Sequence, residues 1–303
     1  MSRRTFRPHY WALAQLGSRI RYTPPIARRL TQGELFDESV IQIPTRRGHV
    51  RAVVVRPPRI DPVRAAPPVV VHLHGGGFLN RYPEQDIHLA RYLCAQLRAV
   101  MVLPDYSTAP AVRYPLAEEQ MYDAATWVQD SGVEHGWGGT RLFLSGISAG
   151  AKLAINICQQ IRDHGGRPPT AASLIVPVTH MTRTDRTSPA ARPAINPFVQ
   201  RLVAWAYFPD EERRAEPLAA PRNDTHLAAA MPPTIIQTAA LDTLAPEGRE
   251  LAETLSAAGV TTAFTERPDS DHGYYSSKPA DRVRTMLDDV VDFFSSRVRD
   301  GQP

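Results

Sequence analysis

The chain has 303 residues, of which 43% are hydrophobic and 22% are charged, as is ordinary for one large globular domain or two small ones. The formal net charge is +4, but the arginines are scattered among acidic residues, which argues against the concentrated basic stripe of a nucleic-acid-binding protein. No apolar run in the sequence approaches the ~20 residues that a membrane-spanning helix needs, so we expect no stable membrane insertion.

The N-terminal stretch precedes the first predicted strand, and we expect residues 1–35 to form an N-terminal cap segment. No small-residue cleavage site follows the short apolar stretch at residues 10–17, so we expect no signal peptide. The segment is the most basic part of the chain. It is therefore a candidate for peripheral contact with a membrane surface or an acidic partner.

Predicted strands and helices alternate along the rest of the chain. Residues 38–45 and 49–57 are expected to form an antiparallel hairpin. Further strands are predicted at 67–74, 99–106, 140–146, 171–179, 232–242 and 261–268, and helices at 87–97, 117–130, 148–166, 246–259 and 281–298. Such alternation is typical of βαβ units, so we expect an α/β fold with a mostly parallel sheet of about eight strands and helices on both faces.

The alternation stops between Thr179 and Met231, where about fifty residues contain no clear strand. A connection of this length in a compact domain is usually functional. We therefore expect a cap insert over about residues 180–230. Together with the N-terminal segment it would form a helical cap on a catalytic α/β domain of residues 36–303.

A possible nucleophile motif, G-I-S-A-G, occupies residues 146–150, after a predicted strand and at the start of a predicted helix. In this context G-x-S-x-G forms a nucleophile elbow, a strained turn that presents the serine hydroxyl to a cleft. The flanking residues Gly146 and Gly150 allow such a turn without side-chain clashes. The motif therefore predicts that Ser148 is a nucleophile.

A serine nucleophile needs a base, and the base needs an acid that orients it. In this fold the acid and then the histidine follow the serine along the chain. His272 follows the last predicted strand and Asp242 ends the strand before it, so we expect both beside Ser148 at the carboxyl edge of the sheet. Alternative acids are Glu247, Asp269 and Asp271.

Three consecutive glycines, in the stretch His74 to Phe78, follow the strand at 67–74. Attack on an ester carbonyl creates an oxyanion, which fixed backbone N–H groups stabilise. Glycine lets the backbone approach that oxygen without an intervening side chain. We expect the donors to be Ala149, which follows the nucleophile, and Gly75 or Gly76.

At these residues the chain resembles the hormone-sensitive-lipase-like branch of the α/β-hydrolase esterases. The matching pieces are residues 74–78, 105–110, 114–115, 146–150, 241–248 and 272–273. The resemblance implies an α/β-hydrolase fold and carboxylic-ester hydrolysis by Ser148, Asp242 and His272 without a metal or cofactor. It also implies that Gly75, Gly76 and Ala149 form the oxyanion hole, and that the glycine loop is supported by His74, Gly77 and Asp105. Departures from the family pattern are Ser107, Ala111, Ile147 and Ala151.

The predicted function is therefore a serine carboxylesterase that hydrolyses short- to medium-chain acyl esters through an acyl-enzyme. Alternatives are an amidase, deacetylase or lactonase with the same triad, a membrane-peripheral lipase, and a non-catalytic binding protein, which should lack a triad residue. Candidate pocket walls, some of which are alternatively core residues, are Phe78, Leu79, Tyr82, Trp205, Phe208 and Tyr274.

The expected partner is a small-molecule ester rather than nucleic acid, and the family resemblance suggests a homodimer. Cys94 and Cys158 fall in predicted helices without metal-ligand spacing. We interpret them as buried free thiols in a reducing compartment, which indicates a cytoplasmic location.

Overall fold

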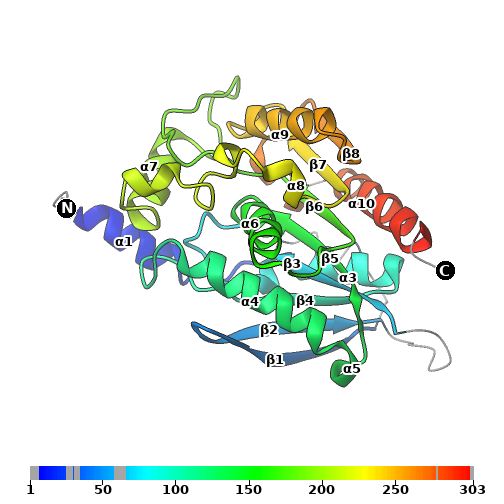
Figure 1. Cartoon of the computed structure of the whole chain (residues 1–303). Helices are drawn as coiled ribbons and strands as arrows, with labels where there is room; N and C mark the ends of the chain where they lie inside the picture. Colours follow the sequence, from blue (N-terminus) through cyan, green and yellow to red (C-terminus); the bar gives the residue numbers. More distant parts are fainter. Residues whose placement is uncertain (1–6, 25–29, 31–34, 58–65, 278, 301–303) are drawn as a thin grey trace.

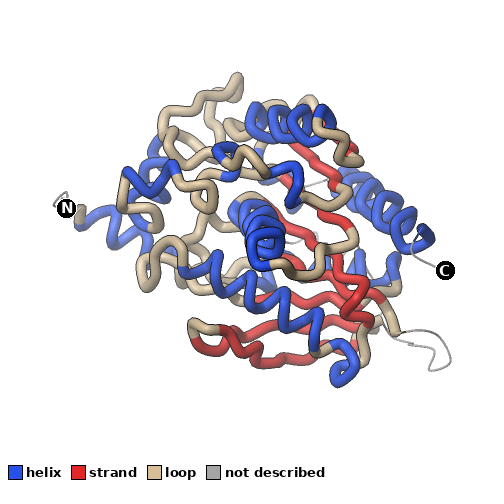
Figure 2. Tube along the Cα trace, viewed as in Figure 1, coloured by secondary structure: helices blue, strands red, loops and turns tan. Residues whose placement is uncertain are grey.

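The computed structural model describes residues 7–24, 30, 35–57, 66–277 and 279–300. Within these residues eight strands form one central sheet with helices on both faces (Figure 1, Figure 2). The strands are β1 (Asp37–Thr45), β2 (Gly48–Arg56), β3 (Pro68–Leu73), β4 (Val100–Pro104), β5 (Gly138–Ile147), β6 (Ala171–Ile175), β7 (Thr234–Ala239) and β8 (Thr262–Arg267). Their order across the sheet is β1-β2-β4-β3-β5-β6-β7-β8.

The sheet is mostly parallel. β1 and β2 form the predicted antiparallel hairpin, and β2 also pairs antiparallel with β4. All other neighbouring strands run parallel. β3 is buried along its whole length, because helices cover a parallel sheet on both faces. The predicted α/β fold with about eight strands is confirmed.

The longer helices cover both faces of the sheet. The helices are α1 (Pro8–Gly17), α3 (Ile87–Leu97), α4 (Leu116–Asp130), α5 (Gly132–His135), α6 (Ala149–His164), α7 (Pro197–Ala206), α8 (Leu227–Ala230), α9 (Ala245–Ala257) and α10 (Ala280–Asp300), with short 3-10 turns η1 (Pro83–Asp86), η2 (Glu212–Ala215), η3 (Pro221–Asn223) and η4 (His272–Ser276). α4, α6 and α9 pack on one face of the sheet, and α3 and α10 pack on the other. No helix of the described residues is long and apolar enough to cross a membrane.

The connection between β6 and β7 contains α7, which explains its apolar residues. The side-chain oxygen of Asn196 accepts hydrogen bonds from the N–H groups of Phe198 and Val199, at 3.0 and 3.1 Å, and so caps the start of this helix. α1 lies beside α7, where the Tyr10 ring meets the rings of Phe198 and Trp205 edge-on at 5.5 and 5.7 Å (Figure 1). The two predicted cap pieces therefore lie together, and the division of the chain into cap and catalytic domain stays a prediction.

The central helix α6 is buried from Ala149 to Ile161, although several of its side chains are polar. Lys152 has no exposed surface, and its ammonium group donates to Glu118 Oε1, Asn156 Oδ1 and the Leu218 carbonyl at 2.8, 2.7 and 2.8 Å. All three donors of the ammonium are thus used. Burial lowers the pKa of Lys152, and the Glu118 carboxylate opposes that shift.

The Lys152 cluster joins the α4/α6 layer to the insert. The second oxygen of Glu118 accepts a hydrogen bond from the Tyr207 hydroxyl at 2.6 Å. Aromatic rings of Phe78, Tyr114 and Phe208 surround the Lys152 ammonium, with centroids 5.5, 5.9 and 5.5 Å away. Because Tyr207 and Leu218 belong to the insert, the buried ion pair fixes the insert against α4 and α6.

We expect Lys152→Met to lower stability by about 3–5 kcal/mol, because it leaves the buried Glu118 carboxylate without a counter-charge. The double variant Lys152→Met/Glu118→Gln should recover part of this loss, since no charge is then left buried. Urea unfolding monitored by fluorescence measures both midpoints, with Glu118→Gln as the matched single variant. A Lys152→Met midpoint equal to that of the wild type would contradict the role given to the pair.

Candidate active site

Ser148 lies on the sharp turn between β5 and α6. Its backbone has φ 55° and ψ −115°, a conformation that a non-glycine residue rarely adopts. The turn packs too closely for side chains on either side. A Cβ on Gly146 would lie 2.4 Å from the Gly150 carbonyl oxygen, and one on Gly150 would lie 2.0 Å from that of Leu73. Both glycines are therefore required by space, as the G-x-S-x-G motif predicts.

The side chains of Ser148, His272 and Asp242 form a continuous hydrogen-bonded chain. His272 Nε2 lies 3.0 Å from Ser148 Oγ, and His272 Nδ1 lies 2.7 Å from Asp242 Oδ2. A carboxylate can only accept, so Nδ1 carries the proton and Nε2 is left to accept from the serine hydroxyl. The other oxygen of Asp242 accepts from the Leu244 N–H at 3.0 Å, which fixes the carboxylate. All three side chains of this hydrogen-bonded chain are buried.

The loop that carries His272 is tied to the insert. One carboxylate oxygen of Asp271 accepts from the His272 N–H at 2.7 Å, and the other accepts from the Ala194 N–H at 2.8 Å. Asp271 therefore braces the loop of the base and is not in the position of the triad acid. Asp242 occupies that position, in the loop three residues after β7 ends at Ala239.

The glycine loop is held through its carbonyl groups. The Tyr106 hydroxyl donates to the His74 carbonyl at 2.8 Å, and the Tyr106 ring stacks on the His74 ring at 4.2 Å. The Gly75 carbonyl accepts from His74 Nδ1 at 2.7 Å and from Gln85 Nε2 at 3.1 Å. In a trans peptide the N–H points opposite to the C=O, so these contacts orient the N–H groups of Gly75 and Gly76.

Side chains are excluded from the rest of this loop. Gly76 and Gly77 have φ of 114° and 61°, which is left-handed backbone that favours glycine. A Cβ on Gly76 would lie 2.6 Å from that of Asn80.

The Ala149 N–H, at the first position of α6, has no acceptor within its own helix. Asp105, at the end of β4, accepts from Arg81 Nε at 3.2 Å just beyond the loop.

His74 is neutral in the folded protein. It is buried, and burial lowers the pKa of its imidazole. Because the Gly75 carbonyl can only accept, Nδ1 of His74 carries the ring proton. Within the described residues its Nε2 has no hydrogen-bond partner. The side chain thus acts on the loop as a neutral donor.

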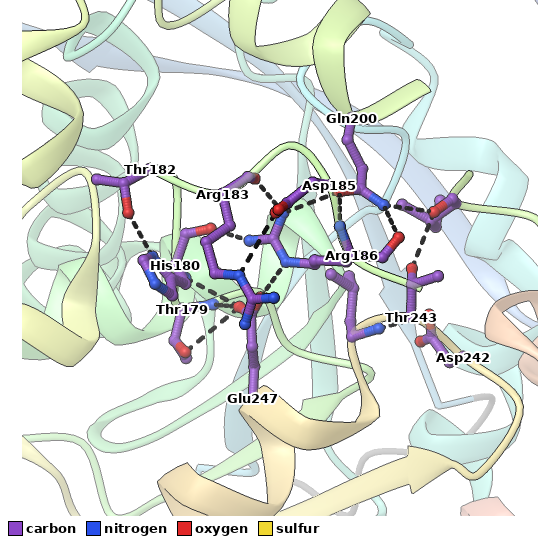
Figure 3. A network of polar contacts seen from close by, with 12 residues as sticks. Thr179, His180, Thr182, Arg183, Asp185, Arg186, Gln200, Asp242, Thr243 and Glu247 are labelled. Carbon is purple, nitrogen blue, oxygen red and sulfur yellow. Dashed lines mark hydrogen bonds and ion pairs between the residues drawn. The ribbon is translucent and has the colours of Figure 1, made fainter. Parts of the chain in front are cut away.

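A second buried ion pair holds the insert against the start of α9, just beyond Asp242 (Figure 3). Glu247, in the first turn of α9, accepts from the N–H groups of Thr179 and His180 at 2.7 and 2.9 Å and from Arg186 Nε. Arg186 and Gln200 bind each other through the Arg186 backbone. Glu247 is therefore a bracing residue five positions beyond Asp242, and not an alternative acid.

The predicted pocket residues separate into three groups. Phe78, Phe208 and Tyr274 are fully buried, the first two around Lys152. Leu79 and Trp205 lie at the junction with α1, the former against Gly17 and the latter against Tyr10. Tyr82 lines a surface cavity of about 500 Å³, beside β1 and β2, whose lining includes no triad residue. Their role as pocket walls stays a prediction.

Several supporting residues have no motif in the sequence. Gln85 lies ten residues beyond the carbonyl that it binds, and Arg186 reaches Glu247 from 61 residues away. The one signal that a sequence could offer for such supporting residues is a charged residue within an otherwise buried helix, as at Lys152. Among the described residues no group of three or more His, Cys, Asp or Glu side chains could hold a metal ion.

Comparison with known proteins places this geometry in a family. A family model for the alpha/beta hydrolase fold matches residues 70–276, which is more than half of the chain. The chain belongs to the α/β-hydrolase family. This α/β-hydrolase is 31% identical to carboxylesterase NlhH of Mycobacterium tuberculosis over 219 residues, covering 70% of this chain and 68% of that protein. It is also 31% identical to esterase LipI of the same organism over 224 residues, covering 72% and 68%.

Solved structures of esterases superpose on the α/β-hydrolase closely. An esterase from Pyrobaculum calidifontis matches with a TM-score of 0.80 and 26% identity, over 96% of this chain and 92% of that one. The carboxylesterase EstE1, from a metagenomic library, also has a TM-score of 0.80 and 26% identity, over 98% and 97%. The predicted resemblance to the hormone-sensitive-lipase-like branch is confirmed.

We expect Gly150→Ala to lower stability by about 1–3 kcal/mol and to reduce kcat, because the new Cβ forces α6 away from β3. Gly166→Ala is the matched control, since its Cβ would meet its nearest atom at an ordinary 3.4 Å. Urea midpoints and ester turnover measure both effects. Equal midpoints for the two variants would show that the close contact at Gly150 does not constrain the turn.

The buried, neutral His74 should make stability depend on pH. Its pKa is lower in the folded than in the unfolded chain, so its contribution is full above the unfolded pKa of about 6.5 and falls as the pH falls. His74→Asn keeps an N–H donor without titrating there. Between pH 7 and 5 the free energy of unfolding should fall more steeply for the wild type, by up to about 1.4 kcal/mol per pH unit. If the free energy of unfolding changed equally with pH in the two proteins, His74 would not be the cause of the pH dependence.

Proposed function

We propose that the protein is a serine carboxylesterase that hydrolyses small acyl esters by acyl transfer through Ser148. The observation that carries this proposal is the aligned chain from Ser148 Oγ to His272 and Asp242, at 3.0 and 2.7 Å, on a strained strand-to-helix turn. The relatives named carboxylesterase and esterase support the same reaction.

In the first step the serine oxygen attacks the ester carbonyl carbon. His272 Nε2 takes the hydroxyl proton as the C–O bond forms, and the carbonyl electrons move to the oxygen. Asp242 keeps the imidazole in the tautomer required for this transfer and stabilises the imidazolium. The imidazolium then gives its proton to the departing alkoxide, which leaves as the alcohol, and the acyl group stays on Ser148.

The developing oxyanion is expected to bind the N–H groups of Gly75, Gly76 and Ala149. The carbonyl anchors on the far side of the glycine loop support this role, because they hold its peptide planes before substrate arrives. In the second step His272 takes a proton from water, the resulting hydroxide attacks the acyl carbon, and the protonated imidazole returns the proton to Ser148 as the acid leaves.

The finer parts of the proposal concern substrate size and setting. A preference for short- to medium-chain acyl groups rests on the resemblance to hormone-sensitive-lipase-like esterases, as does the expectation of a homodimer. A cytoplasmic location is supported by Cys94 and Cys158, which are both buried thiols.

Hydrolysis of a p-nitrophenyl acyl series, from acetate to long chains, tests the proposal. Ser148→Ala should remove the turnover, and Asp242→Asn should reduce kcat by about 10⁴, since the imidazole loses its tautomer control. The matched control is Ser173→Ala on the neighbouring strand β6, because the buried Ser173 hydroxyl has no partner within the described residues. That variant should keep wild-type turnover.

The outcome that would overturn the proposal is equal, negligible turnover by wild type and Ser148→Ala at every chain length. Matched amide and lactone substrates then distinguish an amidase, deacetylase or lactonase from a non-catalytic binding protein. Turnover of the amide at or above the rate of its matched ester would also replace the esterase assignment with an amidase.

A further inference from the structure

Helix α1 is apolar on most of its surface, yet only Tyr10 and Ala14 are buried. Six of the ten large hydrophobic side chains that are exposed in the described residues lie on α1, on the segment after it, or at the adjoining start of α7. We name this surface the N-terminal patch. It consists of Trp11, Leu13, Leu16, Ile20, Tyr22 and Phe198. A helix that is hydrophobic around most of its circumference is usually covered by another apolar phase.

The same part of the chain carries all of the protein's excess positive charge. The first 33 residues of the sequence contain seven arginines and no aspartate or glutamate, whereas the other 270 residues carry 28 basic and 31 acidic side chains. Arg7, Arg19 and Arg21 are exposed among the apolar residues of the patch. The partner of this surface must therefore accept both cationic and apolar groups.

We propose that the N-terminal patch docks the protein onto an anionic phospholipid surface. Such a surface offers headgroup charge to the arginines and an acyl boundary to Leu16 and Ile20, while Trp11 and Tyr22 suit the interface between the two. Each arginine near an anionic membrane adds to the electrostatic attraction.

Two other occupants fit less well. A symmetric contact between two copies would place the patch against itself, so Arg7, Arg19 and Arg21 would face their own copies without any acidic residue of the patch between them. An acidic protein surface would pair with these arginines, but it would not cover the apolar side chain of Leu16, which is 63% exposed. A lipid surface satisfies both groups at once.

The patch adjoins the proposed active site. A Cβ on Gly17, at the end of α1, would lie 3.6 Å from that of Leu79, and the Arg21 guanidinium lies over the Tyr82 ring at 5.4 Å. Leu79 and Tyr82 follow directly after the glycine loop. If the proposed esterase function holds, docking turns this side of the enzyme toward esters dissolved in the membrane; the docking itself does not depend on that function.

Cosedimentation of the full chain with large unilamellar vesicles tests the proposal. The protein should sediment with phosphatidylcholine/phosphatidylglycerol vesicles at low salt, should be released at high salt, and should not sediment with phosphatidylcholine alone. Leu16→Ser/Ile20→Ser should reduce binding at least tenfold. The matched control is Val133→Ser, on α5, because Val133 is 96% exposed and outside the patch. It should bind as the wild type does.

Turnover of a soluble p-nitrophenyl ester distinguishes failure of docking from failure of the enzyme, because the Leu16→Ser/Ile20→Ser variant should keep wild-type turnover while losing vesicle binding. The proposal is overturned if the wild type does not bind anionic vesicles at low salt, or if this variant binds equally well. Two further results would overturn the proposal. In one, the protein does not bind vesicles, and sedimentation velocity shows a dimer that the Leu16→Ser/Ile20→Ser variant abolishes. In the other, the protein binds soluble polyglutamate but no vesicles.

Discussion

The close approach of the start of α6 to the end of β3 is the contact on which the site depends. At Gly150 there is no room for a single carbon atom beside the Leu73 carbonyl. This contact forces the chain through the strained conformation at Ser148, and it brings Ser148 next to the glycine loop, which begins where β3 ends. β3 also pairs in parallel with β5. This pairing aligns the ends of both strands at one edge of the sheet, where the glycine loop and Ser148 follow them.

Next to this contact, the glycine loop, Asp242 and His272 are each held in place by hydrogen bonds. The glycine loop leaves its N–H groups unobstructed because Tyr106, His74 and Gln85 bind the carbonyl groups of the same peptides. Asp242 and the loop of His272 are likewise held by hydrogen bonds to backbone N–H groups, which leave His272 Nε2 facing Ser148 Oγ. Preorganisation of this kind avoids reorganisation during the reaction, which is where fixed dipoles are most effective.

Two buried ion pairs hold the insert over this machinery. Lys152 and Glu118 secure its later part to α6 and α4, and Arg186 and Glu247 secure its earlier part to α9. Buried pairs contribute little net stability, since desolvation offsets much of the attraction, but a pair with one partner removed is strongly unfavourable. They therefore favour one arrangement of insert and core over others in which either charge would be left alone.

The sequence by itself determined the fold class, the eight strands, the order of the motifs and the residues that form the hydrogen-bonded triad. These features depend on local rules: apolar periodicity, glycine where backbone is crowded, and the placement of polar residues at the carboxyl ends of parallel strands. The sequence favoured Asp242 as the acid but left Glu247, Asp269 and Asp271 open, because all four follow the last two strands at the same edge of the sheet.

Only the tertiary structure decided between them, since the choice depends on which carboxylate reaches Nδ1 of His272 and which ones bind backbone N–H groups instead. It also decided that Phe78 and Phe208 surround Lys152, and that Gln85 holds the glycine loop. Partners such as Lys152 and Glu118 lie 34 residues apart on different helices. Their contact follows from how those helices pack, and no spacing along the chain records it.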